Sequence, residues 1–88
     1  MYLHLGQNEV VPSRRIIGIF DLDHASYSAR TRKFLAAAQE DGVVLDLSEE
    51  LPKSFVLCDH PYHKQILYLS QLNSVTLQRR AEAEKLDF

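Results

Sequence analysis

Apolar and polar residues alternate at the start of the chain with the period of a β-strand. In residues 2–5 the leucines fall on one face and Tyr2 and His4 on the other, because successive side chains of a strand point to opposite sides. A polar turn signal follows in residues 6–9, and a pair of valines begins the return. The pattern predicts a short strand, a turn and the start of a second strand.

An uninterrupted apolar run follows in residues 15–22, with the sequence RIIGIFDL. Such a run is typical of a strand that is covered on both faces. A domain of 88 residues hides only about 60 to 65% of its unfolded surface. We therefore expect other subunits to contribute to the cover of this strand.

The strongest helical pattern spans residues 28–41. Ser28 suits the N-cap position and Gly42 is placed to end the helix. The apolar stripe recurs at three and four residue spacing, through Tyr27, Thr31, Phe34, Leu35 and Ala38.

The rest of the chain predicts more strands and a second helix. The strands are expected at residues 43–47, 54–58 and 65–69. The helix is expected to begin near Asn73 or Ser74. Strands that follow one another in sequence favour a single α+β domain with a small, mostly antiparallel sheet of about five strands and two helices.

Charge and cysteine content narrow the class of protein. Ten Lys and Arg against twelve Asp and Glu leave a formal charge of −2, whereas dedicated nucleic-acid binders are often basic. Local clustering of cations matters more, because phosphates respond to the local potential. Cys58 has no cysteine partner in the chain, and no apolar run approaches the roughly 20 residues of a membrane helix. We expect a soluble, cytoplasmic protein without a membrane partner.

The charges of the predicted helix run against its dipole. Arg30, Arg32 and Lys33 occupy its opening turns, and Glu40 and Asp41 its last turn, at a cost of about 0.3 to 1 kcal/mol for each exposed charge. The basic start can receive a phosphate, or it can meet the acidic end of the next subunit in a head-to-tail ring. A third reading is that solvated charges are simply tolerated.

Two pairs of arginines stand out. Arg14 and Arg15 lie between a proline and the apolar strand, so that they project from a rigid element and lose less entropy on contacting phosphate. The alternative is an ordinary solvated pair at a strand entrance. Arg79 and Arg80 lie on the last helix, where an ion pair of Arg80 with Glu84 is the favoured role.

The segment IIGIFDLDHAS resembles the nucleophile strand of haloacid-dehalogenase-type phosphatases, which use two aspartates and Mg²⁺. A chain of this length cannot supply that parallel fold, so we expect Asp21 and Asp23 to end a strand and the protein not to be an enzyme.

The segment CDHPYH holds the zinc-ligand types Cys58, Asp59, His60 and His63. No second cluster completes a site, so we expect a loop and no metal, cofactor or small-molecule substrate.

Three segments carry a resemblance to a known family. They are MYLHLGQNEVVPSRRIIGIFDLD at the start, DLSEELPKSFVL at 46–57 and ILYLSQLNSVTLQRRA at 66–81. Together they resemble the small RemA/RemB-type regulators of bacterial extracellular-matrix genes, closest to the RemB (YaaB-like) branch. The resemblance covers residues 1–81 and leaves 82–88 as the end of the last helix or a tail.

The resemblance implies closed homo-oligomeric rings that bind double-stranded DNA. It matches Arg15 to a functionally required arginine and Lys53 to a basic position before the Phe-Val strand. An adjacent arginine pair of the RemA branch is replaced here by Glu50 and Leu51, so DNA affinity should be weaker or should use other cations. The candidate DNA-binding residues are Arg14, Arg15, Arg30, Arg32, Lys33 and Lys53.

The leading hypothesis is therefore a ring-forming, DNA-binding transcriptional regulator of matrix (biofilm) genes. It would hold the phosphate backbone, with base preference arising from DNA shape, because the sequence shows no recognition helix. The alternative is an oligomeric scaffold or protein-interaction module of the same fold without DNA binding.

Overall fold

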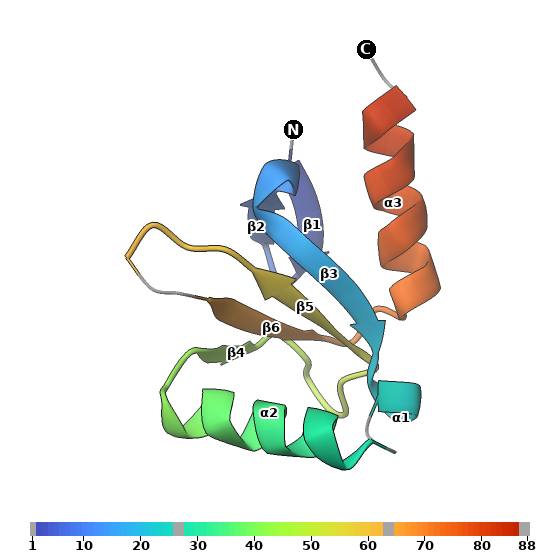
Figure 1. Cartoon of the computed structure of the whole chain (residues 1–88). Helices are drawn as coiled ribbons and strands as arrows, with labels where there is room; N and C mark the ends of the chain where they lie inside the picture. The colour runs from blue at the N-terminus through green and yellow to red at the C-terminus, as the bar shows by residue number, and fades with distance from the viewer. Residues whose placement is uncertain (1, 26–27, 63–64, 87–88) are drawn as a thin grey trace.

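The computed structural model describes residues 2–25, 28–62 and 65–86. Its elements are β1 (Tyr2–Gly6), β2 (Glu9–Pro12), the 3₁₀ turn η1 (Ser13–Arg15), β3 (Ile16–Asp21), α1 (Leu22–Ala25), α2 (Ala29–Glu40), β4 (Val44–Asp46), β5 (Ser54–Cys58), β6 (Ile66–Ser70) and α3 (Ser74–Leu86). The predicted α+β class is confirmed (Figure 1). Within the described ranges, the helices lack the length and apolar character needed to cross a lipid bilayer.

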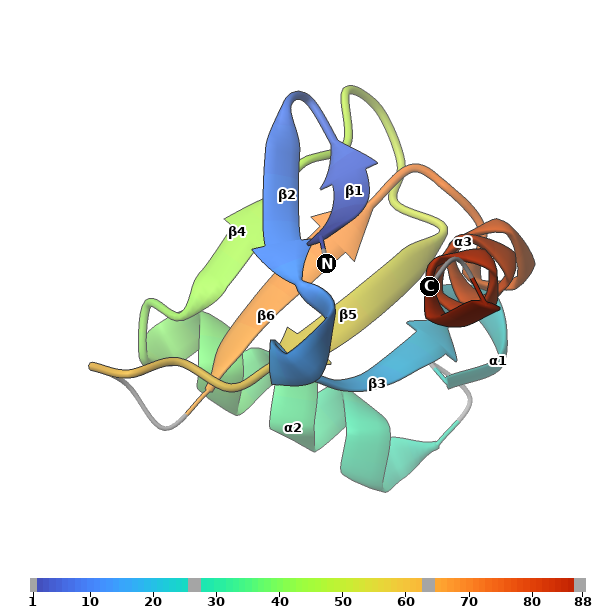
Figure 2. The same cartoon turned by 90° about the horizontal axis from the view of Figure 1, so that it is seen from above.

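The strands form two sheets where one was expected. β1 and β2 make an antiparallel hairpin, and the larger sheet has the order β3-β5-β6-β4. β5 runs antiparallel to β3 and β6, while β4 runs parallel to β6. The hairpin packs across one face of the larger sheet (Figure 2). In the strand order of that sheet, β3 and β4 are the two edges.

A hydrophobic core lies on each face of the larger sheet. On one face, Leu3 and Leu5 of the hairpin and Leu77 of α3 pack against sheet residues that include Val56 and Tyr68. On the other face, α2 packs its buried Ala38 against Phe55 and Leu67. Tyr27, which was predicted to belong to the apolar stripe of α2, lies outside the described residues.

Buried serines join the hairpin, the sheet and the segment before α3. The hydroxyl of Ser70 donates to the carbonyl of Leu5 over 2.7 Å and accepts from the Leu72 N–H over 3.1 Å. The hydroxyl of Ser54 donates to the carbonyl of Leu72 over 2.6 Å. Because these polar groups are paired, their burial is compatible with the surrounding core.

Residues with positive φ and one side-chain cap define the hairpin turn and the two ends of α2. Gln7 and Asn8 have φ values of 45° and 66°, as a two-residue hairpin connection requires. Ser28 caps α2 by accepting from the Thr31 N–H over 3.4 Å. Gly42, with a φ of 72°, follows the last turn, so both predicted ends of this helix are confirmed.

The strand expected at residues 15–22 is shorter than predicted. Arg15 belongs to η1, and Leu22 begins the unpredicted helix α1, where its N–H donates to the Lys53 carbonyl over 3.0 Å. The expected cover of both faces is also incomplete in a single chain. Because β3 is an edge strand, Ile17 is 58% exposed and Phe20 41% exposed.

Candidate nucleic-acid interface

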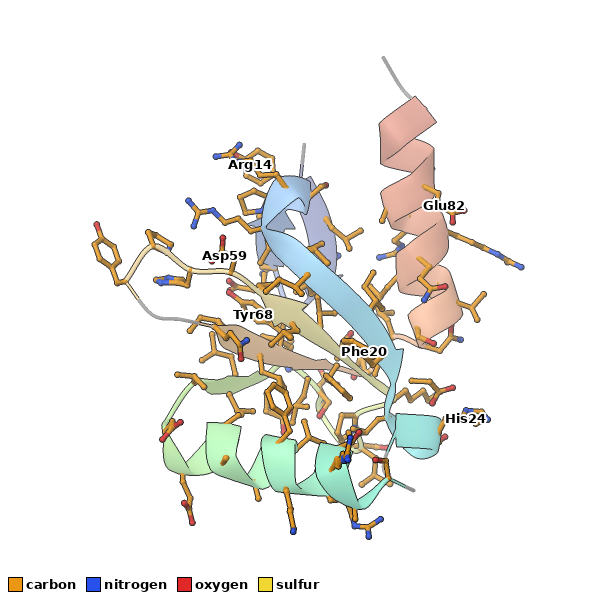
Figure 3. The ribbon with its side chains drawn as sticks, in the orientation of Figure 1. Arg14, Phe20, His24, Asp59, Tyr68 and Glu82 are labelled. Atoms are coloured by element: carbon orange, nitrogen blue, oxygen red, sulfur yellow. The ribbon has the colours of Figure 1, made fainter. Side chains whose placement is uncertain are left out.

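Arg14 and Arg15 lie on η1, the tight turn that joins the hairpin to β3. Pro12 precedes the turn, and the Ile16 N–H closes it by donating to the Ser13 carbonyl. Arg14 is exposed, as Figure 3 shows, and Arg15 is half-buried. The structure therefore supports the prediction that this pair projects from an ordered element.

The backbone of Arg15 is held by the loop that follows β5. The N–H of Asp59 donates to the Arg15 carbonyl over 2.8 Å. Arg14, Arg15, Asp59, His60 and Pro61 line a polar hollow of about 320 Å³. The loop thus places one carboxylate and one imidazole beside the two guanidinium groups.

The two guanidinium groups remain available to an outside anion. Neither forms an ion pair with a carboxylate that the structure describes, although Asp59 lines the same hollow. An adjoining hollow of about 240 Å³ extends from Arg15 to the apolar side chains of Val10 and Tyr68. Phosphate oxygens are suitable partners for the guanidinium groups, since arginine presents several N–H donors in a fixed fork.

Arg30, Arg32 and Lys33 form a second group on the first turns of α2. All three are exposed. Helix α2 covers the face of the sheet opposite the hairpin, whereas η1 adjoins the hairpin (Figure 1). One protomer therefore does not bring this group together with Arg14 and Arg15 on one face.

Lys53 lies apart from both groups. It immediately precedes β5, and its N–H donates to the Ser70 carbonyl over 2.8 Å. Because β3 and β5 are antiparallel, Arg15 and Lys53 lie at opposite ends of their ladder, about 20 Å apart at roughly 3.3 Å per residue. Lys53 also shares a hollow with Glu49 and Glu50, whose carboxylates lower the local positive potential.

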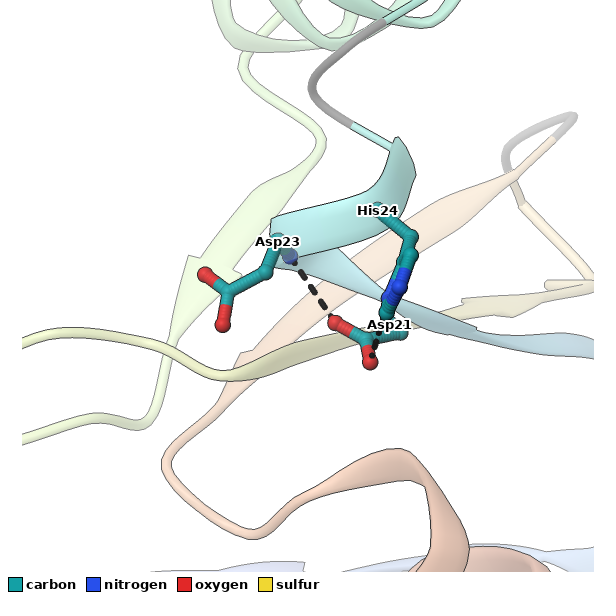
Figure 4. Close-up of polar contacts among 3 residues, drawn as sticks. All are labelled: Asp21, Asp23 and His24. Atoms are coloured by element: carbon teal, nitrogen blue, oxygen red, sulfur yellow. Dashed lines mark hydrogen bonds and ion pairs between the residues drawn. The ribbon is translucent and has the colours of Figure 1, made fainter.

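Asp21 and Asp23 have a local structural role (Figure 4). The Asp21 carboxylate accepts from the Asp23 N–H over 2.9 Å, and its second oxygen lies 3.1 Å from the His24 Nδ1. The hydrogen bond with His24 lowers the pKa of Asp21. The expectation that both aspartates end the strand is wrong for Asp23, which belongs to α1, because the Asp21 side chain turns the backbone directly after β3.

The CDHPYH segment divides between core and surface. Cys58 is buried, and burial raises the pKa of its thiol to about 11. His60 accepts from the Tyr62 N–H over 3.1 Å. His63 lies outside the described residues. Within the part of the chain that the structure describes, His, Cys, Asp and Glu side chains do not gather into a group of three that could hold a metal ion.

The sequence did not point to Asp59 and His60 as neighbours of Arg15. They follow β5 in sequence, and only the antiparallel register of β3 and β5 brings them to η1. The resemblance drew attention to Arg15 and Lys53, which the fold separates. Hydrophobic periodicity does not reveal which strands pair, so it could not have shown that the loop after β5 lies beside Arg15.

Two comparisons place the chain among known proteins. Residues 2–81 match the family model described as RemA-like, extracellular matrix regulatory protein A-like. Extracellular matrix regulatory protein B of Bacillus subtilis (strain 168) is 40% identical over 82 residues, which cover 93% of this chain and 91% of that protein.

Proposed function

Because the chain belongs to the RemA-like family of extracellular matrix regulatory proteins, we propose that it regulates matrix genes by binding double-stranded DNA as a homo-oligomeric ring. Arg14 and Arg15 are the primary phosphate contacts of each copy. The protein acts on transcription in the cytoplasm and uses no catalytic step and no cofactor.

The observation that carries the proposal is that Arg14 and Arg15 are held on an ordered turn without an ion pair to a described carboxylate. Both guanidinium groups project from an ordered turn, and neither is neutralised by a described carboxylate. A side chain that is already positioned loses less conformational entropy when it contacts a phosphate. The pair is therefore better suited to a polyanion than cations on a flexible tail.

Assembly is required because one copy offers little positive potential. The chain carries a formal charge of −2, and its candidate cations lie in separate places on the fold. A ring would repeat the Arg14 and Arg15 site at regular intervals, so that several weak phosphate contacts add along one duplex. Base preference would then come from DNA shape.

The carboxylates that lie beside the candidate cations favour a different function, an oligomeric scaffold without DNA binding. Glu49 and Glu50 share a hollow with Lys53, and Asp59 lines the hollow beside Arg15. If these carboxylates outweigh the cations, the assembly repels phosphate and binds only protein.

A fluorescence-anisotropy titration with labelled duplexes of several sequences separates the two functions. Replacing Arg15 by alanine (Arg15→Ala) should weaken binding to every duplex, because a phosphate contact carries no direct sequence information. The loss should reach roughly 5-fold per engaged contact, because a solvent-exposed ion pair contributes up to about 1 kcal/mol. Arg79→Ala, at an exposed position of α3, serves as the matched control and should leave affinity unchanged.

The scaffold function would be favoured by absence of DNA binding at low salt. Equal losses for Arg15→Ala and Arg79→Ala would also contradict the assignment, since they would reflect overall charge and not the η1 site.

A further inference from the structure

We propose that the β3 edge of the sheet receives the β4 edge of a second copy of the same chain, in a head-to-tail contact. This inference rests on the assembly required by the proposed function. It adds the surfaces through which the copies meet, which the proposed function leaves open.

The receiving surface is an aromatic groove between β3 and the start of α2. Phe20, Phe34 and Phe55 line it together with Arg30 and other residues, over a volume of about 280 Å³. Phe20 stacks on Phe55 with ring centroids 4.8 Å apart, yet it stays 41% exposed, and Phe34 is 38% exposed. Large aromatic side chains at a surface groove are typical anchors of protein interfaces.

Ile17 is a further exposed apolar residue of the same edge strand. The register of β3 and β5 shifts between Ile16 and Gly18, which leaves Ile17 as the extra residue of a bulge, and it is 58% exposed. A bulge discourages uncontrolled strand pairing at an edge. The bulge therefore favours a contact made through side chains over open-ended sheet growth.

The donated surface lies at the opposite edge. Leu45 of β4 is 46% exposed, and the acidic end of α2, Glu40 and Asp41, is exposed beside it in sequence. The positive φ of Gly42 lets the chain turn directly from α2 into β4. Leu45 pairs with Tyr68 and lies on the hairpin side of the sheet, whereas Glu40 and Asp41 end α2 on the opposite side. The β4 edge therefore carries an exposed leucine on one side of the sheet and two carboxylates on the other.

Helix α2 connects the two surfaces (Figure 2). Its first turns line the groove with Phe20 of β3, and its later residues Leu35 and Gln39 line a hollow with Val44 of β4. The helix therefore crosses the sheet from the basic, aromatic edge to the acidic edge. Two different, complementary edges on one chain make a heterologous contact, which propagates head to tail and can close into a ring.

Charge complementarity identifies the occupant as another copy. Arg30 and Lys33 at the helix start oppose the dipole, as do Glu40 and Asp41 at its end. Head-to-tail stacking of α2 ends would neutralise both groups at once. The carboxylate of Asp21, at the end of β3, is already engaged by Asp23 and His24.

Charge-swapped variants test the contact by native mass spectrometry without DNA. One variant carries Arg30→Glu with Lys33→Glu, and the other carries Glu40→Lys with Asp41→Lys. Each swap agrees with the helix dipole, so loss of assembly cannot be attributed to a weaker helix. The control Arg79→Glu with Arg80→Glu makes the same charge change as the first variant on α3.

We expect the wild type and the control to assemble and each swapped variant alone to lose the assembly. Mixing the two variants should restore it, because every contact in an alternating assembly again joins opposite charges. A chain that carries all four substitutions should also assemble. This restoration is a result that a merely destabilised protein would not give.

The remaining outcomes contradict either the proposed assembly or the proposed contact between the two sheet edges. A monomeric wild type contradicts the assembly in the proposed function and this contact with it. An assembled wild type whose swapped variants also assemble contradicts only the contact, as does failure of the fourfold variant to assemble. Failure of DNA binding would leave these masses unchanged and would be detected separately by the anisotropy titration.

Discussion

The thiol of Cys58 lies in the core between the larger sheet and the hairpin. Burial raises its pKa from 9.0 to about 11, because the charged thiolate is poorly solvated there. The neighbouring Asp59 and His60 lie at η1, on the surface side of the same loop. Adjacent residues of the CDHPYH segment thus have different roles, one in packing and the others beside the arginine pair.

The native thiol should react slowly with iodoacetamide. At pH 8 its thiolate fraction is about 100-fold below that of a thiol with pKa 9, because each pKa unit changes the fraction tenfold. Mass spectrometry should show fast alkylation in urea and slow alkylation in buffer. Equal rates would contradict the burial of this side chain.

The same pKa shift makes stability depend on alkaline pH. A thiol whose pKa is higher in the folded state stabilises the fold below its unfolded pKa, and the contribution disappears as pH rises through the folded value. Urea midpoints of the wild type should therefore fall between about pH 9 and 11. Cys58→Ala should lack this part of the pH dependence.

At the scale of elements, α2 covers one face of the larger sheet and spans the distance between its two edges. Its apolar residues cover the sheet, and its ends carry the charges of both edges. Its position depends on how the chain leaves the helix at Gly42, whose φ is 72°. This backbone conformation of Gly42 directs the chain into β4, which then pairs with β6.

Gly42→Ala should destabilise the fold by about 1 kcal/mol, because an L-residue resists a positive φ. A Cβ at this position would meet no atom within 4 Å, so the cost arises in the backbone alone. Gly42→Asn should cost less, since asparagine tolerates the left-handed region better. Urea denaturation measures both, and equal costs for the two variants would contradict this explanation.

Local patterns predicted most elements and few of their spatial relations. The alternation of β1, the bounds of β5 and the caps of α2 follow from neighbouring residues, and all are confirmed. The short helix α1 was missed because Leu22 reads as the end of an apolar run. The parallel pairing of β4 with β6 was missed because periodicity does not encode the partner of a strand.

The candidate site shows the same limit. The sequence singled out Arg14 and Arg15, but the distance of Lys53 from them depends on the antiparallel register of β3 and β5. The reversed charges of α2 left phosphate binding, assembly and simple tolerance of solvated charges open, and the proposal of assembly depends on the aromatic groove beside them. Side chains that meet only through tertiary packing leave no local signal.

At the scale of the whole molecule, the proposed function requires a protein with a surplus of acid to bind a polyanion. Its net charge of −2 opposes binding at long range, and salt reduces that repulsion. In the proposed assembly, the Arg14 and Arg15 pair of each copy would act at short range, where the number and spacing of the pairs would decide the affinity. Assembly through opposite sheet edges would fix that spacing.

The salt dependence of duplex DNA affinity tests this account most directly. One protomer offers Arg14 and Arg15 as its primary phosphate contacts, and two contacts support a slope of log affinity against log salt no steeper than about −2. Binding by several protomers at once predicts a steeper slope in an anisotropy titration of the wild type. A slope shallower than this limit, or no binding at low salt, would contradict the central claim that assembly multiplies the arginine site.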